Sequence, residues 1–225
     1  MTQEKPQPQA RAERLIEGLL RLVCFISLPL LLLFGLTILF SLVFTGSLNT
    51  NVNDAEGFFT VFLTFSLPMV LALAAAPLAV QIGLRKRGAA ELGLILPQSR
   101  LWKWATVFMA AGSAVLAAVL SNAENLLQPA FTVWSHFFFV AVAEEIMLRS
   151  VLSHELEGFL QSPWLLCLVN GIIFAFVYHS NDAFLPNLLV RVPLGFALCL
   201  VRVKSGSVYP AIALHWLYNM FVVTI

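Results

Sequence analysis

The chain has 225 residues, of which 60% are hydrophobic and 11% are charged, and its mean hydropathy is +0.88. Soluble domains carry about 25% charged residues, so this composition excludes an ordinary soluble fold and indicates a multi-pass membrane protein. Lys plus Arg (13) nearly balance Asp plus Glu (12), so the net charge predicts neither a nucleic acid nor an acidic partner. Cys24, Cys167 and Cys199 lie in apolar runs without CxxC spacing, and we expect buried side chains rather than disulfides or metal ligands.

The chain divides into a polar start, two apolar runs and a longer membrane core. Residues 1–21 are expected to form a polar tail and an interfacial lead-in, because charges and leucines recur at helical spacing from Arg11 to Arg21. Residues 22–84 are expected to form two transmembrane helices. Residues 85–225 contain the other apolar segments, without a repeat, a soluble domain or a Gly-rich phosphate loop.

Seven apolar segments reach or approach the length of about 20 residues that a helix needs to cross a bilayer. The predicted fold is therefore all-α, a polytopic transmembrane helix bundle of about seven spans, with six to eight allowed. The predicted limits are 22–44, 58–84, 102–121, 131–150, 163–179, 184–201 and 207–225.

The basic residues indicate how these spans are oriented. Lys and Arg occur in the N-terminal tail, between Arg85 and Lys103, at Arg149, and at Arg202 and Lys204, whereas the loops on the other side contain none. The positive-inside rule then places the N-terminus in the cytoplasm and the C-terminus outside. Because its loops are short, the chain is predicted to be a multi-pass protein of the plasma (inner) membrane of a prokaryote.

Three ionisable residues, Glu144, Glu145 and Arg149, stand at the end of an apolar run. A charged residue near the centre of a membrane helix costs roughly 2.5–3.5 kcal/mol on insertion scales, so such a cluster is a functional-site hypothesis. Neighbours on a helix point about 100° apart, whereas residues four apart share a face. We therefore expect Glu145 and Arg149 to form an ion pair, which leaves Glu144 to point elsewhere. A plain ion pair near the cytoplasmic end is the alternative, and it leaves Glu144 unexplained.

Two further polar clusters interrupt the later apolar segments. His179 ends an aromatic-rich run, and His215 and Asn219 lie four apart on one face of the last segment. This pattern indicates a polar neighbour or a water-filled cavity, with an interfacial histidine and a helix-packing contact as the alternatives. A rise of roughly 1.5 Å per residue puts Glu144 and His215 both roughly 10–12 Å above the cytoplasmic face but carries His179 to roughly 24 Å. The sequence leaves the depth of His179 open.

Three ordered motifs stand in the second half of the chain: Glu144-Glu145-x-x-x-Arg149, an aromatic-rich segment ending in His179, and His215-x-x-x-Asn219. Together they resemble the motifs of the CPBP family of intramembrane proteases. This is the CAAX-protease and bacteriocin-processing (Abi) group, which includes the Rce1-like proteases. The resemblance covers about residues 85–225. It has one departure, because the family's second motif is Phe, three residues, His, whereas position 175 is Ala between Phe174 and Phe176.

The resemblance implies that Glu144 is the catalytic carboxylate. It also implies that His179 positions or activates water and that His215 with Asn219 binds water or stabilises the oxyanion. A buried carboxylate acting as general base, with hydrogen-bond donors for the tetrahedral intermediate, is compatible chemistry. The same glutamate and two histidines could instead hold Zn²⁺ with an open position. We prefer hydrolysis without a cofactor, because Asn219 suits a donor better than a fourth ligand and no HExxH helix is present.

Supporting roles are expected for three further residues. The resemblance implies that Glu145 and Arg149 support Glu144. Arg191 lies in the middle of a predicted span, which is an unfavourable place for an idle charge. We expect it to pair with an acidic residue, Glu145 first, and Asn187, one turn earlier, to join the same network.

The leading functional hypothesis is an intramembrane endopeptidase that cleaves a protein or peptide substrate near the cytoplasmic side of the bilayer. The alternative is a non-proteolytic scaffold or immunity protein of the same fold, which binds a peptide or a membrane partner in its polar cavity. A small transporter with Glu144 as proton relay is a third interpretation, disfavoured because no paired broken-helix repeat is visible. The sequence specifies neither the substrate nor the oligomeric state.

Overall fold

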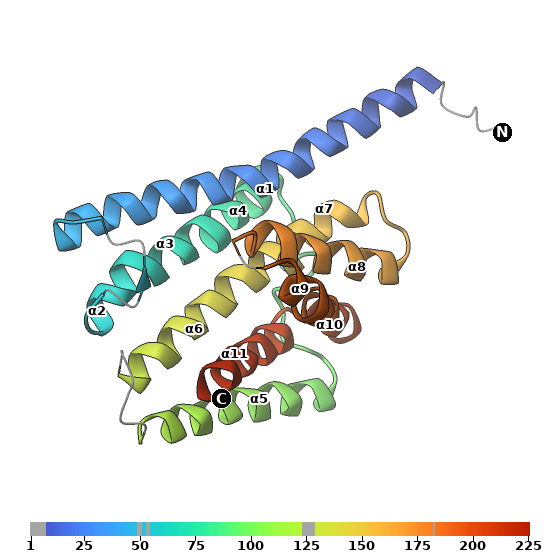
Figure 1. The fold of residues 1–225 in the computed structure, drawn as a ribbon. Helices are drawn as coiled ribbons and strands as arrows, with labels where there is room; N and C mark the ends of the chain where they lie inside the picture. The colour runs from blue at the N-terminus through green and yellow to red at the C-terminus, as the bar shows by residue number, and fades with distance from the viewer. Residues whose placement is uncertain (1–7, 49–50, 53–54, 123–128, 182) are drawn as a thin grey trace.

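The computed structural model describes residues 8–48, 51–52, 55–122, 129–181 and 183–225, with side chains from residue 16 onward. Every regular element in these residues is helical, and adjoining segments form seven continuous helices (Figure 1). The all-α fold predicted from the sequence is thereby confirmed.

Four of the seven described helices contain π-helical segments, in which a wider turn replaces the α-helical one; these carry η labels. The elements in chain order are α1 (Pro8–Thr45); α2 (Phe58–Val61), η2 (Phe62–Ser66), α3 (Leu67–Met69), η3 (Val70–Ala75), α4 (Ala76–Leu78) and η4 (Ala79–Leu84); α5 (Arg100–Leu120); α6 (Ala130–Glu145), η5 (Ile146–Leu152) and α7 (Ser153–Glu157); α8 (Pro163–Ile173) and η6 (Phe174–Tyr178); α9 (Phe184–Pro186), η7 (Asn187–Arg191) and α10 (Val192–Ser205); and α11 (Tyr209–Thr224).

Five of the described helices are long and apolar enough to cross a membrane: Ile16–Thr45, Phe58–Leu84, Arg100–Leu120, Ala130–Glu157 and Phe184–Ser205. The α8–η6 helix is apolar but shorter, and α11 has 16 residues. The chain is therefore a polytopic helical membrane protein, as predicted. Two limits differ from the prediction. The lead-in is continuous with the first span in α1, and the helix that contains α6 runs to Glu157 rather than to residue 150.

The α6 and η5 segments lie at the centre of the bundle (Figure 1). On one side they pack against η3, and α1 covers η2 and η3 from the outside. On the other side α6 packs against α11, with α5 beyond it. The α8 and α10 helices pack on each other and contact η5. Side chains that enter the middle of the bundle from α6, η6, η7 and α11 can therefore meet.

The position of α1 at the edge of the bundle corrects one expectation about the cysteines. Cys167 and Cys199 are buried as predicted, whereas Cys24 on α1 is exposed. The window of α1 that is apolar enough to span a membrane has only 6% of its residues buried inside the protein. This surface faces outward, so the apolar run around Cys24 is suited to contact with lipid.

The α8 and α10 helices approach closely where two glycines meet. A Cβ atom on Gly171 would lie 2.7 Å from the carbonyl oxygen of Val192 and 2.9 Å from the amide nitrogen of Phe196. A Cβ atom on Gly195 would lie 2.8 Å from Gly171 Cα. Small residues of this kind let membrane helices pack backbone against backbone. The two glycines therefore set the distance between α8 and α10.

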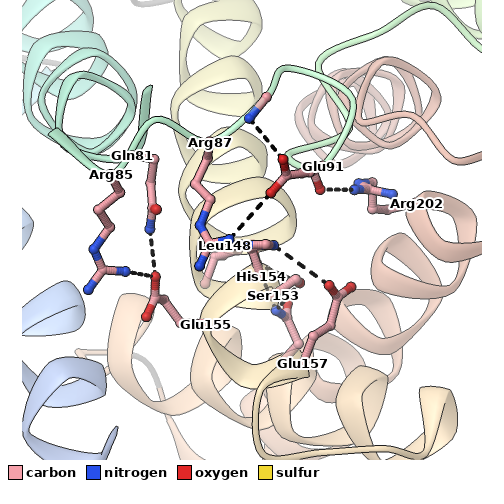
Figure 2. A network of polar contacts seen from close by, with 12 residues as sticks. Gln81, Arg85, Arg87, Glu91, Leu148, Ser153, His154, Glu155, Glu157 and Arg202 are labelled. Carbon is pink, nitrogen blue, oxygen red and sulfur yellow. Dashed lines mark hydrogen bonds and ion pairs between the residues drawn. The ribbon is translucent and has the colours of Figure 1, made fainter. Parts of the chain in front are cut away.

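Polar contacts lie at one end of the bundle, between η4, α7, α10 and the connection that follows η4 (Figure 2). Glu155 on α7 accepts hydrogen bonds from Gln81 Nε2 at 2.7 Å and from the guanidinium of Arg85. The backbone carbonyl of Glu91 accepts from Arg202 Nη2 at 3.5 Å. The contacts of Glu155 join η4 to α7, and the contact of Arg202 joins α10 to the connection between η4 and α5. Arg85, Arg87 and Arg202 lie together at this end of the bundle.

Gly171→Ala is expected to lower the free energy of unfolding by about 1–3 kcal/mol, because the added methyl group meets backbone atoms that have to move. Gly35→Ala on α1 is the matched control, since a Cβ atom there meets nothing within 4 Å. Alanine also favours a helix over glycine, so the control should be as stable as the wild type or slightly more so. Denaturant unfolding in detergent micelles measures both. Wild-type stability of Gly171→Ala would contradict the close packing of α8 on α10.

Candidate active site

Glu144 and Glu145 end α6 in the middle of the bundle, and both are buried. Glu145 Oε2 lies 3.1 Å from Arg149 Nε, and neither side chain has any exposed surface. This contact confirms the ion pair predicted from the four-residue spacing. Charges removed from water are stable only when further hydrogen bonds satisfy them. The other contacts of Arg149 and Glu145 therefore matter for the stability of this pair.

The guanidinium of Arg149 connects three helices. Its Nη2 donates to the backbone carbonyl of Gly195 on α10 at 3.2 Å. Its Cζ lies 5.1 Å from the ring centre of Phe174 on η6, and the face of an aromatic ring attracts a cation. Arg149 therefore holds both α10 and η6 beside the glutamates.

The helix leaves the α-helical pattern directly after Glu145, where η5 begins. The carbonyl of Leu148 accepts from Ser153 Oγ at 2.9 Å and from Asn170 Nδ2 at 2.8 Å. Side-chain bonds of this kind satisfy the backbone groups of a wide turn inside a membrane, and π-helical turns are frequent at functional sites. Asn170 thus anchors α8 to η5. The sequence prediction did not include Asn170, although it is the polar residue in an otherwise apolar run and that contrast is a usable signal.

His215 on α11 bridges the two glutamates. Its Nδ1 lies 2.9 Å from Glu145 Oε1, and its Nε2 lies 3.8 Å from Glu144 Oε2. Because Glu145 is the charged partner of Arg149, it accepts, and Nδ1 carries the shared hydrogen. In the neutral ring Nε2 is then an acceptor directed at Glu144. A separation of 3.8 Å is too long for a direct hydrogen bond and suits a water molecule held by both atoms.

Phe174 lies between the two histidines. Its ring meets His179 edge-on, with 4.8 Å between ring centres, and meets His215 in the same manner at 5.7 Å. Sequence comparison leaves the aromatic contact beside His179 open, because position 175 is Ala. The structure supplies this contact from Phe174.

A cavity of about 220 Å³ brings the predicted catalytic residues together. Glu144, His179, His215 and Asn219 line it, together with Arg191. Glu144 Oε2 is buried and has no hydrogen-bond partner in the described part of the chain. An unsatisfied buried acceptor is unfavourable, so this oxygen is suited to bind water or a ligand. The rest of the lining is apolar or aromatic: Phe137, Val140, Phe174, Leu194, Tyr218, Val222 and Val223.

His179 reaches the cavity, which the depth calculation from sequence left open. The calculation assumed that the α6 helix ends near residue 150, which places Glu144 close to the cytoplasmic face. The helix instead runs to Glu157, so Glu144 lies near its middle and deeper in the bundle. His179 directly follows η6 and lies at the same level as Glu144, because both line one cavity.

Arg191 has a different partner from the one expected. Its Nη1 donates to Asn187 Oδ1 at 3.0 Å, and Asn187 Nδ2 donates to the carbonyl of His179 at 2.8 Å. The network with Asn187 is as predicted, but the pair with Glu145 is wrong. The oxygens of Glu145 contact Arg149 and His215, so they are already occupied. Arg191 instead fixes the backbone at His179 and lines the cavity that contains Glu144.

The described residues contain no group of three His, Cys, Asp or Glu side chains arranged to hold a metal ion. His215 already binds Glu145 through Nδ1, and its Nε2 lies 3.8 Å from Glu144. The predicted zinc alternative of one glutamate and two histidines therefore does not correspond to a formed ligand set in this part of the chain.

The fold and the cavity define a polytopic helical membrane protein with a carboxylate and two imidazoles inside its bundle. Residues 126–221 match the family model described as "Type II CAAX prenyl endopeptidase Rce1-like". This segment contains the glutamates, both histidines and Asn219. This segment is therefore a domain of the Rce1-like type II CAAX endopeptidase family, which is a family of proteases. No curated protein and no solved structure matches the chain.

Arg149→Met is expected to lower the free energy of unfolding by about 3–5 kcal/mol, because it leaves the Glu145 carboxylate buried without its cation. The double variant Arg149→Met with Glu145→Gln is expected to be more stable than Arg149→Met alone, since no unpaired charge remains. Chemical unfolding in detergent micelles measures the full cycle of single and double variants. Additive losses in the double variant would contradict a coupled ion pair.

Proposed function

We propose that the protein is an intramembrane endopeptidase that hydrolyses a peptide bond with a water molecule activated by Glu144. The observation that carries the proposal is the position of Glu144 Oε2. This oxygen is buried, has no hydrogen-bond partner among the described residues, and faces His215 Nε2 across 3.8 Å in a cavity. Membership of a protease family supports the same conclusion.

In this proposal Glu144 is the general base. A water molecule held between Glu144 and His215 gives a proton to the carboxylate while its oxygen attacks the substrate carbonyl carbon. The proton then passes to the leaving nitrogen as the peptide bond breaks. The side-chain amide of Asn219 and a ring N–H of His179 are the proposed donors to the oxyanion that forms in between.

Glu145 is proposed as a positioning residue rather than a second base. Its oxygens contact Arg149 and His215, so it fixes the ring of His215 with Nε2 toward the cavity. Glu144 lacks such partners and keeps an oxygen for water. A non-proteolytic scaffold would gain nothing from a buried carboxylate oxygen left without a partner, and this favours catalysis over the scaffold alternative.

We also propose that all seven helices cross a prokaryotic plasma membrane with the N-terminus in the cytoplasm. Basic residues support this orientation, because Arg85, Arg87 and Arg202 lie at the end of the bundle shown in Figure 2 and no Lys or Arg occurs in residues 46–57, 121–129 or 179–183. In this arrangement residues 22–84 contribute two flanking helices and residues 85–225 form the catalytic core. The substrate is a peptide or protein within or next to the bilayer.

Glu144→Gln is expected to reduce cleavage by about 10²–10⁴-fold, because an amide does not take up the proton of the water. The assay places purified protein in liposomes with a panel of apolar single-span peptides and identifies products by mass spectrometry. Glu157→Gln is the matched control, since this half-exposed glutamate lies outside the cavity and its loss should leave the rate unchanged.

Retained cleavage in a folded Glu144→Gln protein would contradict the mechanism. If the wild type cleaves no member of the panel while Glu144→Gln still binds the same peptides, the scaffold alternative holds instead. Thermal unfolding of both variants shows that a lost rate does not reflect a lost fold.

Asn219→Ala is expected to lower kcat by about 10²–10³-fold with little change in KM, because the proposed donor acts on the oxyanion and not on the bound substrate. Steady-state kinetics on any peptide from the panel that is cleaved separate the two constants. A raised KM with an unchanged kcat would assign Asn219 to substrate binding.

A further inference from the structure

Along α6 and α11 the cavity lining extends from Glu144 and His215 toward one end of the bundle. On α6 the other lining residues, Phe137 and Val140, precede Glu144, and on α11 they follow His215 and continue to Val223. In the proposed topology α6 and α11 both cross the membrane, and they run in opposite directions. The residues before Glu144 on α6 and those after His215 on α11 therefore lie toward the same end of the bundle. The cavity therefore points to the end at which α6 begins and α11 finishes.

The opposite direction is closed by packed side chains. The residues that follow the glutamates on η5, namely Met147, Leu148, Val151 and Leu152, are completely buried. On α11 Ala211 to Ala213, one turn before His215, are buried as well, and Leu214 is half-buried. Arg149 on η5 also has no exposed surface, and it contacts the Gly195 carbonyl on α10. A substrate has no path to Glu144 through this half of the bundle.

The closed half is the half with the basic residues. Arg85 at the end of η4 contacts Glu155 on α7, and Arg202 near the end of α10 donates to the Glu91 carbonyl, in the network of Figure 2. The other end carries the start of α6, the end of η6 and the end of α11, and the connecting residues there contain no Lys or Arg. Under the positive-inside rule the cavity therefore faces away from the cytoplasm. This direction differs from the one expected from sequence, which placed cleavage near the cytoplasmic side.

The size and lining of the cavity restrict what it accepts. Its volume of about 220 Å³ lies below the roughly 300–1,000 Å³ of pockets that enclose whole small molecules. Its walls beyond the polar cluster are apolar, with Val140, Leu194 and Val222 among them. Such a space suits one or two apolar side chains of a peptide whose remaining length lies outside, and it does not require a long lipid group on the substrate.

We propose that the protease takes its substrate from the non-cytoplasmic side of the membrane, as an unmodified apolar peptide segment in the outer half of the bilayer. The proposal rests on the function proposed above for Glu144 and adds the direction of access and the substrate class. Three observations support it together: the cavity lies on one side of Glu144, the buried side chains of η5 close the other side, and basic residues lie at the closed end.

The direction of access is tested by cysteine labelling, which requires no proteolysis. In a Cys24→Ala background, Val140→Cys places a thiol in the cavity and Lys204→Cys places one at the exposed basic end. A membrane-impermeant thiol reagent added to intact cells should label Val140→Cys, and Lys204→Cys should react only after permeabilisation. Labelling of Val140→Cys only in inside-out vesicles, or from neither side, would overturn the proposal.

The substrate class is tested with two single-span reporters that carry the same apolar segment, unwound by a proline, at the outer or the inner boundary of the membrane. The outer reporter should be cleaved at least tenfold faster than the inner one, without any lipid modification. Faster cleavage of the inner reporter would overturn the proposal. If neither reporter is cleaved while the labelling result stands, the proposed proteolytic function is contradicted and the direction of access is not.

Discussion

The buried ion pair between Glu145 and Arg149 is the interaction on which the rest of the site depends. It places a full negative and a full positive charge in the middle of an apolar bundle, and each of its atoms needs a partner there. The partners are the Gly195 carbonyl, the Phe174 ring and His215 Nδ1, which come from three other helices. The contacts of this ion pair thus bring three helices together around the cavity and orient the imidazole in it.

A second consequence is that adjacent glutamates have different roles. Helix phase directs Glu145 into the polar core formed with Arg149, while Glu144 points to the space beside His215 Nε2. The wider π-helical turn that follows is stabilised by Asn170 on α8. The position of the glutamates therefore depends on how α8 packs against η5. The same turn marks the boundary between the sealed, basic half of the bundle and the open half. The junction of α6 with η5 therefore sets the position of the glutamate that acts in the proposed reaction.

Sequence reasoning predicts well what is periodic along one helix and less well what forms between helices. Apolar length predicted the helices, and the four-residue spacing predicted the Glu145–Arg149 pair. The bond from His215 to Glu145 was missed, and Arg191 was assigned a wrong partner, because both depend on which helix faces meet. Exposure of Cys24 was missed for another reason: lipid-facing and core-facing residues are equally apolar, so hydropathy does not separate them. The direction of the cavity likewise depends on packing around η5, which no local pattern records.

The central claim is that Glu144 and His215 hold one water molecule while Glu145 holds the other side of the imidazole. An experimental structure at a resolution that shows ordered water tests this most directly. The account predicts a water within hydrogen-bonding distance of both Glu144 Oε2 and His215 Nε2, with His215 Nδ1 bonded to Glu145. A dry cavity, or a Glu144 carboxylate bound directly to Arg191 with no water between it and His215, would contradict the account.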